Sequence, residues 1–387
     1  MTQNSDRSDA GGAGGVPPRC VVLSRRQASQ HVWQASQYEF EDVIAEVDDV
    51  HLLMPDADRP GELGQLVHGA GNRVRKALGR PRRSTVRPTT QAVDAELFFA
   101  VFAAPHEIAD LRAVQPQLAR SAKKIAFLIE MWSTQVERSA DHLRQLRGFD
   151  HVYVFNRHVI PAVERITGVP TSYIPHAADA LRFAPHSPAP ERSVDVMSYG
   201  RRMHVVTHRA LVDALEDGRL TYLFDTVKGP FETLDYRDHR LVLAARLQRS
   251  RFAVVHKISD TTAKLGMLAG EDMLTTRYFE VVASGAVMLG TAPDLQDFRD
   301  SFDWPDALIP IEVPEPGIVD LVTGLTADSD RIARASTRNV VESLRRHDWS
   351  YRWAQILQEA GLEPRPALAE RHGHLASRAD QLETIRS

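Results

Sequence analysis

The sequence predicts an α/β protein made of two units, and three observations support this class. A chain of 387 residues is too long for one ordinary core, so two domains are expected. Short apolar runs, typical of buried parallel strands, alternate with segments of helical periodicity. The stretch Thr275–Leu289 combines both signals, because a helix that ends at Gly285 leads directly into the apolar run Ala286–Leu289.

The expected strands are short and apolar, and the expected helices carry apolar residues at helical spacing. The strands span residues 20–24, 50–54, 95–104, 123–129, 151–155, 194–199, 252–255 and 286–289. The helices span residues 39–47, 108–118, 332–344, 349–357 and 368–385. A polar linker with three prolines, Pro185–Arg192, separates the two units.

The helix at the centre of this pattern begins with an unusual charge. Thr275 and Thr276 precede it, and their hydroxyls are expected to accept its first free N–H groups. Arg277 stands in the first turn, where a cation is unfavourable unless an anion lies between it and the positive helix end. Phosphate commonly binds at such an end, so a phosphate ligand is predicted. The alternative is a core helix in which Arg277 and Glu280 pair at i,i+3.

Four motifs carry a resemblance to a known family: RYFE at 277–280, ASGAVMLG at 283–290, FDWP at 302–305 and HDWSYRW at 347–353. With them, most of the chain after residue 95 resembles bacterial family 1-type, CgeB-like glycosyltransferases of the GT-B fold. The resemblance implies two Rossmann-like domains that face each other across a cleft. It also implies a nucleotide-diphosphate sugar as donor substrate and no cofactor.

The resemblance assigns donor-binding roles around the central helix. Glu280 matches the acidic residue that reaches the ribose, and Asp272 stands where the family has a glutamate that contacts a sugar hydroxyl. Thr276 and Arg277 open the helix on the donor side. In the family two acidic residues are separated by seven others, which is the spacing of Asp272 and Glu280 here.

Two further cations are expected at strand ends. Gly200-Arg201-Arg202 resembles the Gly-Arg turn that reaches the donor diphosphate, and Lys257 follows the strand 252–255 as a second clamp. The alternative is that Arg201 and Lys257 are exposed loop cations, the common fate of a single basic residue. No G-x-G-x-x-G is present, so a nicotinamide-type site is unsupported.

The acceptor is expected on the first domain. Glu130 and Trp132 follow the strand 123–129, at the sheet edge where open α/β sheets bind ligands. Related enzymes carry an acidic residue and a Trp here, facing the acceptor; the alternative for Glu130 is an ordinary loop carboxylate. His176 belongs to the acceptor side, within Thr171–Pro185, which resembles the segment that closes the first GT-B domain. If the reaction inverts the sugar, Glu130 is the candidate base; if it retains, the leaving phosphate takes the proton.

The resemblance and the composition together give the domain organisation. Residues 1–19 are rich in Gly, Ser, Asp and Pro, which predicts a disordered tail rather than a signal peptide. The first domain is expected over 20–186 with a basic insertion at 63–93, and the nucleotide-sugar-binding domain over 193–345. The helices of 346–387 are expected to cross back to the first domain.

Composition limits the partners. A net charge of −4 gives no overall attraction to nucleic acid, and the single cysteine, Cys20, cannot form an internal disulfide and suits a reducing cytoplasm. The longest apolar stretch is far shorter than a membrane span. A cytoplasmic protein is therefore expected, with a nucleotide sugar as partner and no nucleic acid.

Two stretches before residue 95 are open to more than one interpretation. Asp56-Ala57-Asp58 has the spacing of a metal-binding Asp-x-Asp, but flanking prolines favour a turn, so metal independence is expected. No acidic residue stands between Glu62 and Asp94. That stretch is either a solvated insertion or a docking surface for an anionic membrane or a lipid-linked acceptor. Its cations are Arg73, Arg75, Lys76, Arg80, Arg82, Arg83 and Arg87.

Three rivals to a GT-B glycosyltransferase share some of these features. One is a metal-dependent GT-A enzyme that uses Asp56 and Asp58. Another is a non-catalytic protein of this fold that binds a nucleotide sugar or a partner. The third is a sugar-nucleotide epimerase, because fold alone does not fix function.

Overall fold

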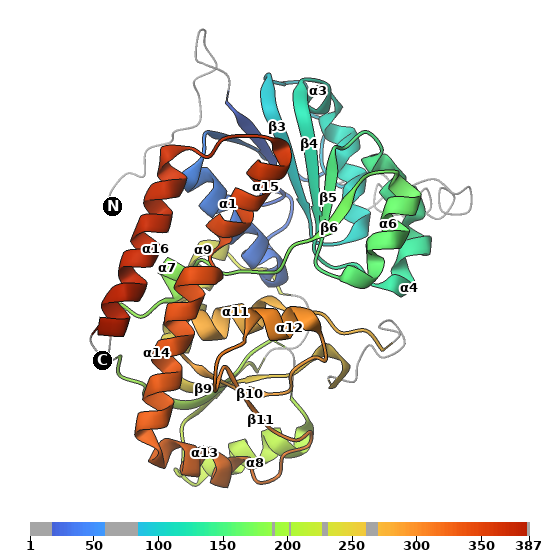
Figure 1. Cartoon of the computed structure of the whole chain (residues 1–387). Coiled ribbons are helices and arrows are strands. Elements are labelled where there is room, and N and C mark those ends of the chain that lie inside the picture. Colours follow the sequence, from blue (N-terminus) through green and yellow to red (C-terminus); the bar gives the residue numbers. More distant parts are fainter. Residues whose placement is uncertain are drawn as a thin grey trace, which may run out of the picture.

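Two parallel sheets form the centre of the molecule, and helices pack around each of them (Figure 1). The structure is a computed structural model that describes residues 18–58, 84–187, 190–200, 203–226, 231–260 and 270–384. Every strand pair in both sheets is parallel. This is the predicted α/β architecture.

The first sheet has the strand order β2-β1-β3-β4-β5-β6. Its strands are β1 (Cys20–Leu23), β2 (Val50–Leu53), β3 (Ala95–Phe102), β4 (Ser121–Leu128), β5 (His151–Val154) and β6 (Thr171–Tyr173). Alternate residues of β1 and β3 enter two different apolar clusters, one on each face of the sheet. Burial on both faces explains why β1 is apolar throughout and β3 is apolar from Leu97 to Phe102.

Short helices connect these strands. The α-helices are α1 (Ala35–Val47), α3 (Gln115–Ala119), α4 (Ser133–Val136), α5 (Ala140–Leu143), α6 (Ile160–Thr167) and α7 (Ala180–Phe183). The 3₁₀ helices are η1 (Val32–Gln34), η2 (Pro105–Val114), η3 (Glu137–Ser139), η4 (Arg144–Leu146) and η5 (Arg157–Val159).

The second sheet has the strand order β11-β10-β9-β7-β8. Its strands are β7 (Val194–Ser198), β8 (Tyr222–Phe224), β9 (Ser250–Val255), β10 (Val287–Gly290) and β11 (Leu308–Pro310). Its helices are α8 (Val205–Glu216), α9 (Tyr236–Gln248), the 3₁₀ helix η6 (Ile258–Asp260), α11 (Thr276–Ala283), α12 (Gln296–Ser301), α13 (Ile318–Ala327) and α14 (Ser329–Arg346). Gly285 has φ +74°, which confirms the left-handed stop after α11.

The chain returns to the first sheet after α14. Helix α15 (Trp349–Ala360) packs on that sheet, where Trp349 stacks on Phe40 at 4.6 Å between ring centroids and Trp353 meets Phe99 edge-on. Helix α16 (Pro366–Thr384) then lies along α14 through Leu375, Ala379 and Leu382 (Figure 1). The two tryptophans of the HDWSYRW motif are therefore packing residues of this return.

Three expectations for local structure were wrong. The segment predicted as one helix over 108–118 is mostly the 3₁₀ helix η2, followed by a single α-turn at α3 that contains Pro116. Proline lacks the N–H that would continue an α-helix through this point. Helix α1 begins at Ala35, four residues before the predicted start. Thr275 is the N-cap of α11, but its side chain makes no capping hydrogen bond.

None of the helices among the described residues is both long and apolar enough to cross a membrane.

Candidate functional site

Polar groups gather where β7 and β8 end, at the carboxyl edge of the second sheet. Gly200 follows β7 with φ +72°, a left-handed conformation that favours glycine. Its N–H donates to Asp225 Oδ2 at 2.8 Å, just beyond the end of β8. A Cβ added at Gly200 would lie 3.6 Å from Arg277 Nη2. The backbone of this turn is thus in contact range of the arginine that opens α11.

Arg277 is a cation without a counter-charge in this part of the fold. Its guanidinium lies over the ring of Tyr199, 5.8 Å from the ring centroid. Within residues 270–384 and the other described ranges, no carboxylate forms an ion pair with it. The first N–H groups of α11 also lack the side-chain caps predicted from Thr275. A cation and a positive helix end, side by side, favour an anion between them.

The end of β9 supplies a second cation. Lys257 lies one residue beyond His256, and its Nζ is 3.8 Å from Asp260 Oδ1. Burial lowers the pKa of His256 to about 4, and the charge of Arg277 acts in the same direction. His256 is therefore neutral at pH 7, whereas Arg277 and Lys257 are cations at this edge.

Asp272, the predicted contact to a sugar hydroxyl, is held by η6. Its Oδ1 accepts from the Ser259 N–H at 2.9 Å and its Oδ2 from Ser259 Oγ at 2.7 Å. Asp272 thereby fixes the segment that carries Lys257. Its contact to a donor sugar stays a prediction.

Glu280, the predicted ribose ligand, is buried rather than paired with Arg277. Its Oε1 accepts from Arg240 Nη1 at 2.5 Å, and its Oε2 accepts from the Tyr199 hydroxyl at 2.8 Å. The i,i+3 pair considered from the sequence is therefore not formed. Thr276, the first residue of α11, is half-buried.

Glu130 and Trp132, which follow the fourth strand of the first sheet, lie where that half of the protein meets the second half. Trp132 is buried with Ile258 and Met273 of the second half, so it packs directly against the segment that follows β9. Its Nε1 donates to Glu130 Oε1 at 3.4 Å. Nearby, Glu271 Oε2 accepts from the Ser133 N–H at 3.2 Å and from Asn156 Nδ2 at 3.1 Å. These contacts hold the two halves against each other at the strand ends.

His176 is the third residue after the end of β6. It is buried against Phe155 and next to Arg352, in the segment that leaves the first sheet. Burial lowers its pKa well below the usual value, and the Arg352 charge adds to this. The structure therefore places this predicted acceptor-side residue in packed protein.

Comparisons with known proteins concern the family and the fold. Residues 201–358 match the family model described as glycosyl transferase-like. The matched part is similar to glycosyl transferases, and it covers less than half of the chain. It contains Lys257, Asp272, Arg277 and Glu280. No curated protein sequence is significantly similar to the chain.

Solved structures show the fold of this chain. An α-glucosyltransferase in complex with UDP has a TM-score of 0.53 at 9% identity, over 89% of this chain and 100% of that one. An α-glucosyltransferase with UDP and DNA gives 0.50 at 7% identity, over 89% and 100%. HepE from Anabaena with UDP gives 0.46 at 11% identity, over 89% and 99%. The fold is GT-B, with two Rossmann-like halves.

The protein has an aromatic pocket beside Gly200 that was not predicted from the sequence. It encloses about 300 Å³ at the ends of β7 and β8. Tyr222 and Phe224 stack at 4.8 Å between ring centroids, and His208 meets Phe224 edge-on at 5.0 Å. The alternation of Tyr222 and Phe224 in a short strand is a usable signal, because it puts both rings on one face.

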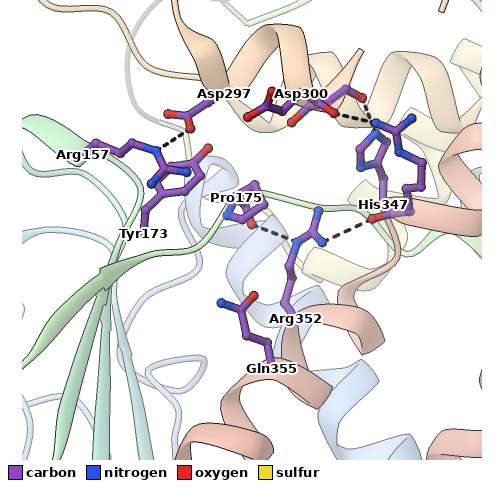
Figure 2. A pocket seen from close by; sticks show the side chains of 10 residues that line it. Arg157, Tyr173, Pro175, Asp297, Asp300, His347, Arg352 and Gln355 are labelled. Carbon is purple, nitrogen blue, oxygen red and sulfur yellow. Dashed lines mark hydrogen bonds and ion pairs between the residues drawn. The ribbon is translucent and has the colours of Figure 1, made fainter. Parts of the chain in front are cut away.

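The chain crosses between the two halves twice, once after β6 and once after α14. A second pocket, of about 360 Å³, lies at these two crossings (Figure 2). Arg157 binds Asp297 at 2.5 Å across it. Arg352 projects into its centre and donates to the carbonyl oxygens of Pro175, His176 and Arg346. Arg346 O lies at the C-terminal end of α14, where a cation is favourable. This arginine therefore closes a helix end and joins the two crossings.

The remaining predicted features are Arg201, the basic stretch and the motif Asp56-Ala57-Asp58. Arg201 and the cations from Arg73 to Arg83 lie outside the described residues, so their roles stay predictions. Asp56-Ala57-Asp58 forms a short antiparallel bridge with the segment at Val86. Among the described residues, no group of three His, Cys, Asp or Glu side chains could hold a metal ion.

Proposed function

We propose that this glycosyltransferase moves a sugar from a nucleotide-diphosphate sugar to an acceptor on the first half, without a metal ion. The observation that carries the proposal is Arg277, which lies beside the Gly200 turn and the N-terminus of α11 with no carboxylate partner among the described residues. A diphosphate placed there would meet this guanidinium, Lys257 and the free N–H groups of α11.

The reaction needs charge stabilisation at this place. The bond from the anomeric carbon to the diphosphate oxygen breaks, the acceptor oxygen forms the new bond, and negative charge develops on the diphosphate. Cations fixed in a partly dry site stabilise such charge strongly, because they need no reorganisation during the reaction. Arg277 and Lys257 would supply this in place of a metal ion, with Arg201 as a further predicted clamp. The acceptor proton passes to the leaving phosphate or to Glu130, depending on the stereochemistry.

The remaining parts of the donor follow from the same placement. The aromatic pocket of Tyr222, Phe224 and His208 adjoins Gly200, so it would receive the nucleoside base by stacking. Glu280 would accept from the ribose hydroxyls and Asp272 from a sugar hydroxyl. Glu130 and Trp132 would face the acceptor. The hydrogen bonds to Glu271, which join the two halves, would help to exclude water that could hydrolyse the donor.

Calorimetry with nucleoside diphosphates tests the base pocket, and UDP comes first because the α-glucosyltransferases of similar fold are in complex with it. Phe224→Ala should weaken UDP binding about tenfold, since stacking on a base contributes about 1–3 kcal/mol. Tyr173→Ala, which alters the pocket at the crossings, should leave the affinity within twofold.

If Tyr173→Ala weakened UDP binding more than Phe224→Ala did, the nucleotide would bind at the crossings instead. If wild-type protein binds neither UDP nor the guanosine and adenosine diphosphates at millimolar concentration, the proposed donor class is wrong. Binding at 100 times the dissociation constant should also stabilise the fold by about 2.7 kcal/mol in a thermal-shift measurement.

A further inference from the structure

The buried carboxylate of Glu39 on α1 lies where the chain crosses between the two halves. Its Oε1 accepts from the Asp179 N–H of the outgoing crossing at 3.0 Å and from Trp349 Nε1 of the returning one at 3.2 Å. The crossings also bind each other, since the Ala178 N–H donates to His347 O and the Trp349 N–H donates to Ala178 O. Glu39 therefore lies where the two crossings meet, and we call this region the hinge.

Arg240 on α9 connects this hinge to the donor helix. Its Nε and Nη2 donate to the two oxygens of Glu39 at 2.7 and 3.0 Å, and its Nη1 donates to Glu280 Oε1 at 2.5 Å. Only 3% of the Arg240 side chain is exposed. Burial opposes its charge, yet the two carboxylates raise its pKa above the ordinary value. One guanidinium thus holds two buried carboxylates from opposite halves of the protein.

The remaining bonding capacity of Glu280 fits a ligand. A carboxylate oxygen can accept two or more hydrogen bonds, and from the described residues each oxygen of Glu280 accepts one, from Arg240 or from Tyr199. The side chain is fixed from both sides, and each oxygen keeps a position for a hydroxyl donor.

We propose that Arg240 is a positioning residue for the donor: it orients Glu280 toward the ribose and, through Glu39, ties that carboxylate to the hinge. The proposal rests on the proposed function. Lysine cannot replace this arrangement, because a single ammonium lacks the planar fork that reaches both carboxylates at once. Without the fork, two buried carboxylates lose their shared counter-charge, and Glu280 is no longer fixed.

Arg371 provides a matched control elsewhere in the same hinge. It is a buried guanidinium on α16 that binds Asp179 Oδ1 at 2.7 Å, Asp348 at 2.9 Å and Glu46 Oε2 at 2.8 Å. Like Arg240 it joins carboxylates of different segments, but it has no contact with Glu280. Arg371→Lys therefore removes a similar buried network without touching the predicted ribose ligand.

Titration calorimetry with UDP and 2′,3′-dideoxy-UDP on wild type, Arg240→Lys and Arg371→Lys tests the proposal. We expect Arg240→Lys to raise the dissociation constant for UDP at least tenfold, and Arg371→Lys to change it less than twofold, although both lower the melting temperature. The loss in Arg240→Lys should disappear with dideoxy-UDP, because the affected contact is to the ribose hydroxyls. A merely structural role would weaken both nucleotides equally.

Glu39→Gln keeps the shape of the hinge side chain and removes its charge, so it serves if Arg240→Lys does not fold. It should also weaken UDP and spare dideoxy-UDP. Wild type that binds UDP, with variants that bind it equally well or lose both nucleotides alike, overturns the positioning role alone. Wild type that binds no nucleoside diphosphate overturns the proposed function and this proposal with it.

Discussion

Replacing Arg277 with methionine should lower kcat/KM for donor turnover by about 10²–10³-fold, the usual cost of removing one fixed group that stabilises developing negative charge. Methionine keeps an unbranched apolar side chain but removes the cation over Tyr199 and beside the Gly200 turn. Release of nucleoside diphosphate from nucleotide sugars, measured with EDTA present, reports the effect without knowledge of the acceptor.

Arg209→Met is the control, because Arg209 is an exposed cation of the same half that pairs with Asp213 on α8 at 2.9 Å. It should keep activity within twofold. Equal activity of wild type and Arg277→Met would remove this arginine from the diphosphate site. Activity that EDTA abolishes and manganese restores would contradict the proposed metal independence.

Gly290→Ala should destabilise the fold by about 3 kcal/mol or more, beyond the usual cost of an overpacked side chain. Gly290 ends β10 between β9 and β11, and an added Cβ would lie 1.5 Å from the carbonyl oxygen of Val255. Backbone cannot move aside as a flexible side chain can, so β9 and β10 would have to separate. Urea unfolding followed by circular dichroism measures the change.

Gly324→Ala is the matched control. Gly324 lies within α13 and has no atom within 4 Å of an added Cβ. Alanine there should stabilise the protein by about 0.5–1 kcal/mol, because glycine loses more backbone entropy in a helix. Equal effects of the two substitutions would mean that the close approach at Gly290 does not govern stability.

The strands of both sheets could be predicted because parallel strands buried on two faces leave a plain sequence signal. The runs 97–102 and 252–255 are short and apolar, and Gly285 marks the stop after α11. The 3₁₀ helix η2 was missed, although Pro105 and Pro116 bracket it in the sequence. The two prolines indicate a break in an α-helix, but the prediction followed the helical spacing of the apolar residues.

The candidate site was predicted only in part, for a physical reason. Arg277 and Lys257 could be named because helix starts and strand ends have sequence signals. The partners of Glu280 could not, since Arg240 is 40 residues away and Glu39 is 201 residues from Arg240. Contacts at such separation depend on how the two halves pack, which spacing along one element does not encode.

A crystal structure of the protein with UDP tests the central claim most directly. The account predicts the diphosphate within hydrogen-bonding distance of the Arg277 guanidinium and the backbone at Gly200, the ribose at Glu280, and the base against Phe224. A nucleotide bound instead between Arg157 and Arg352 at the crossings, or a diphosphate that leaves Arg277 without contact, would contradict it.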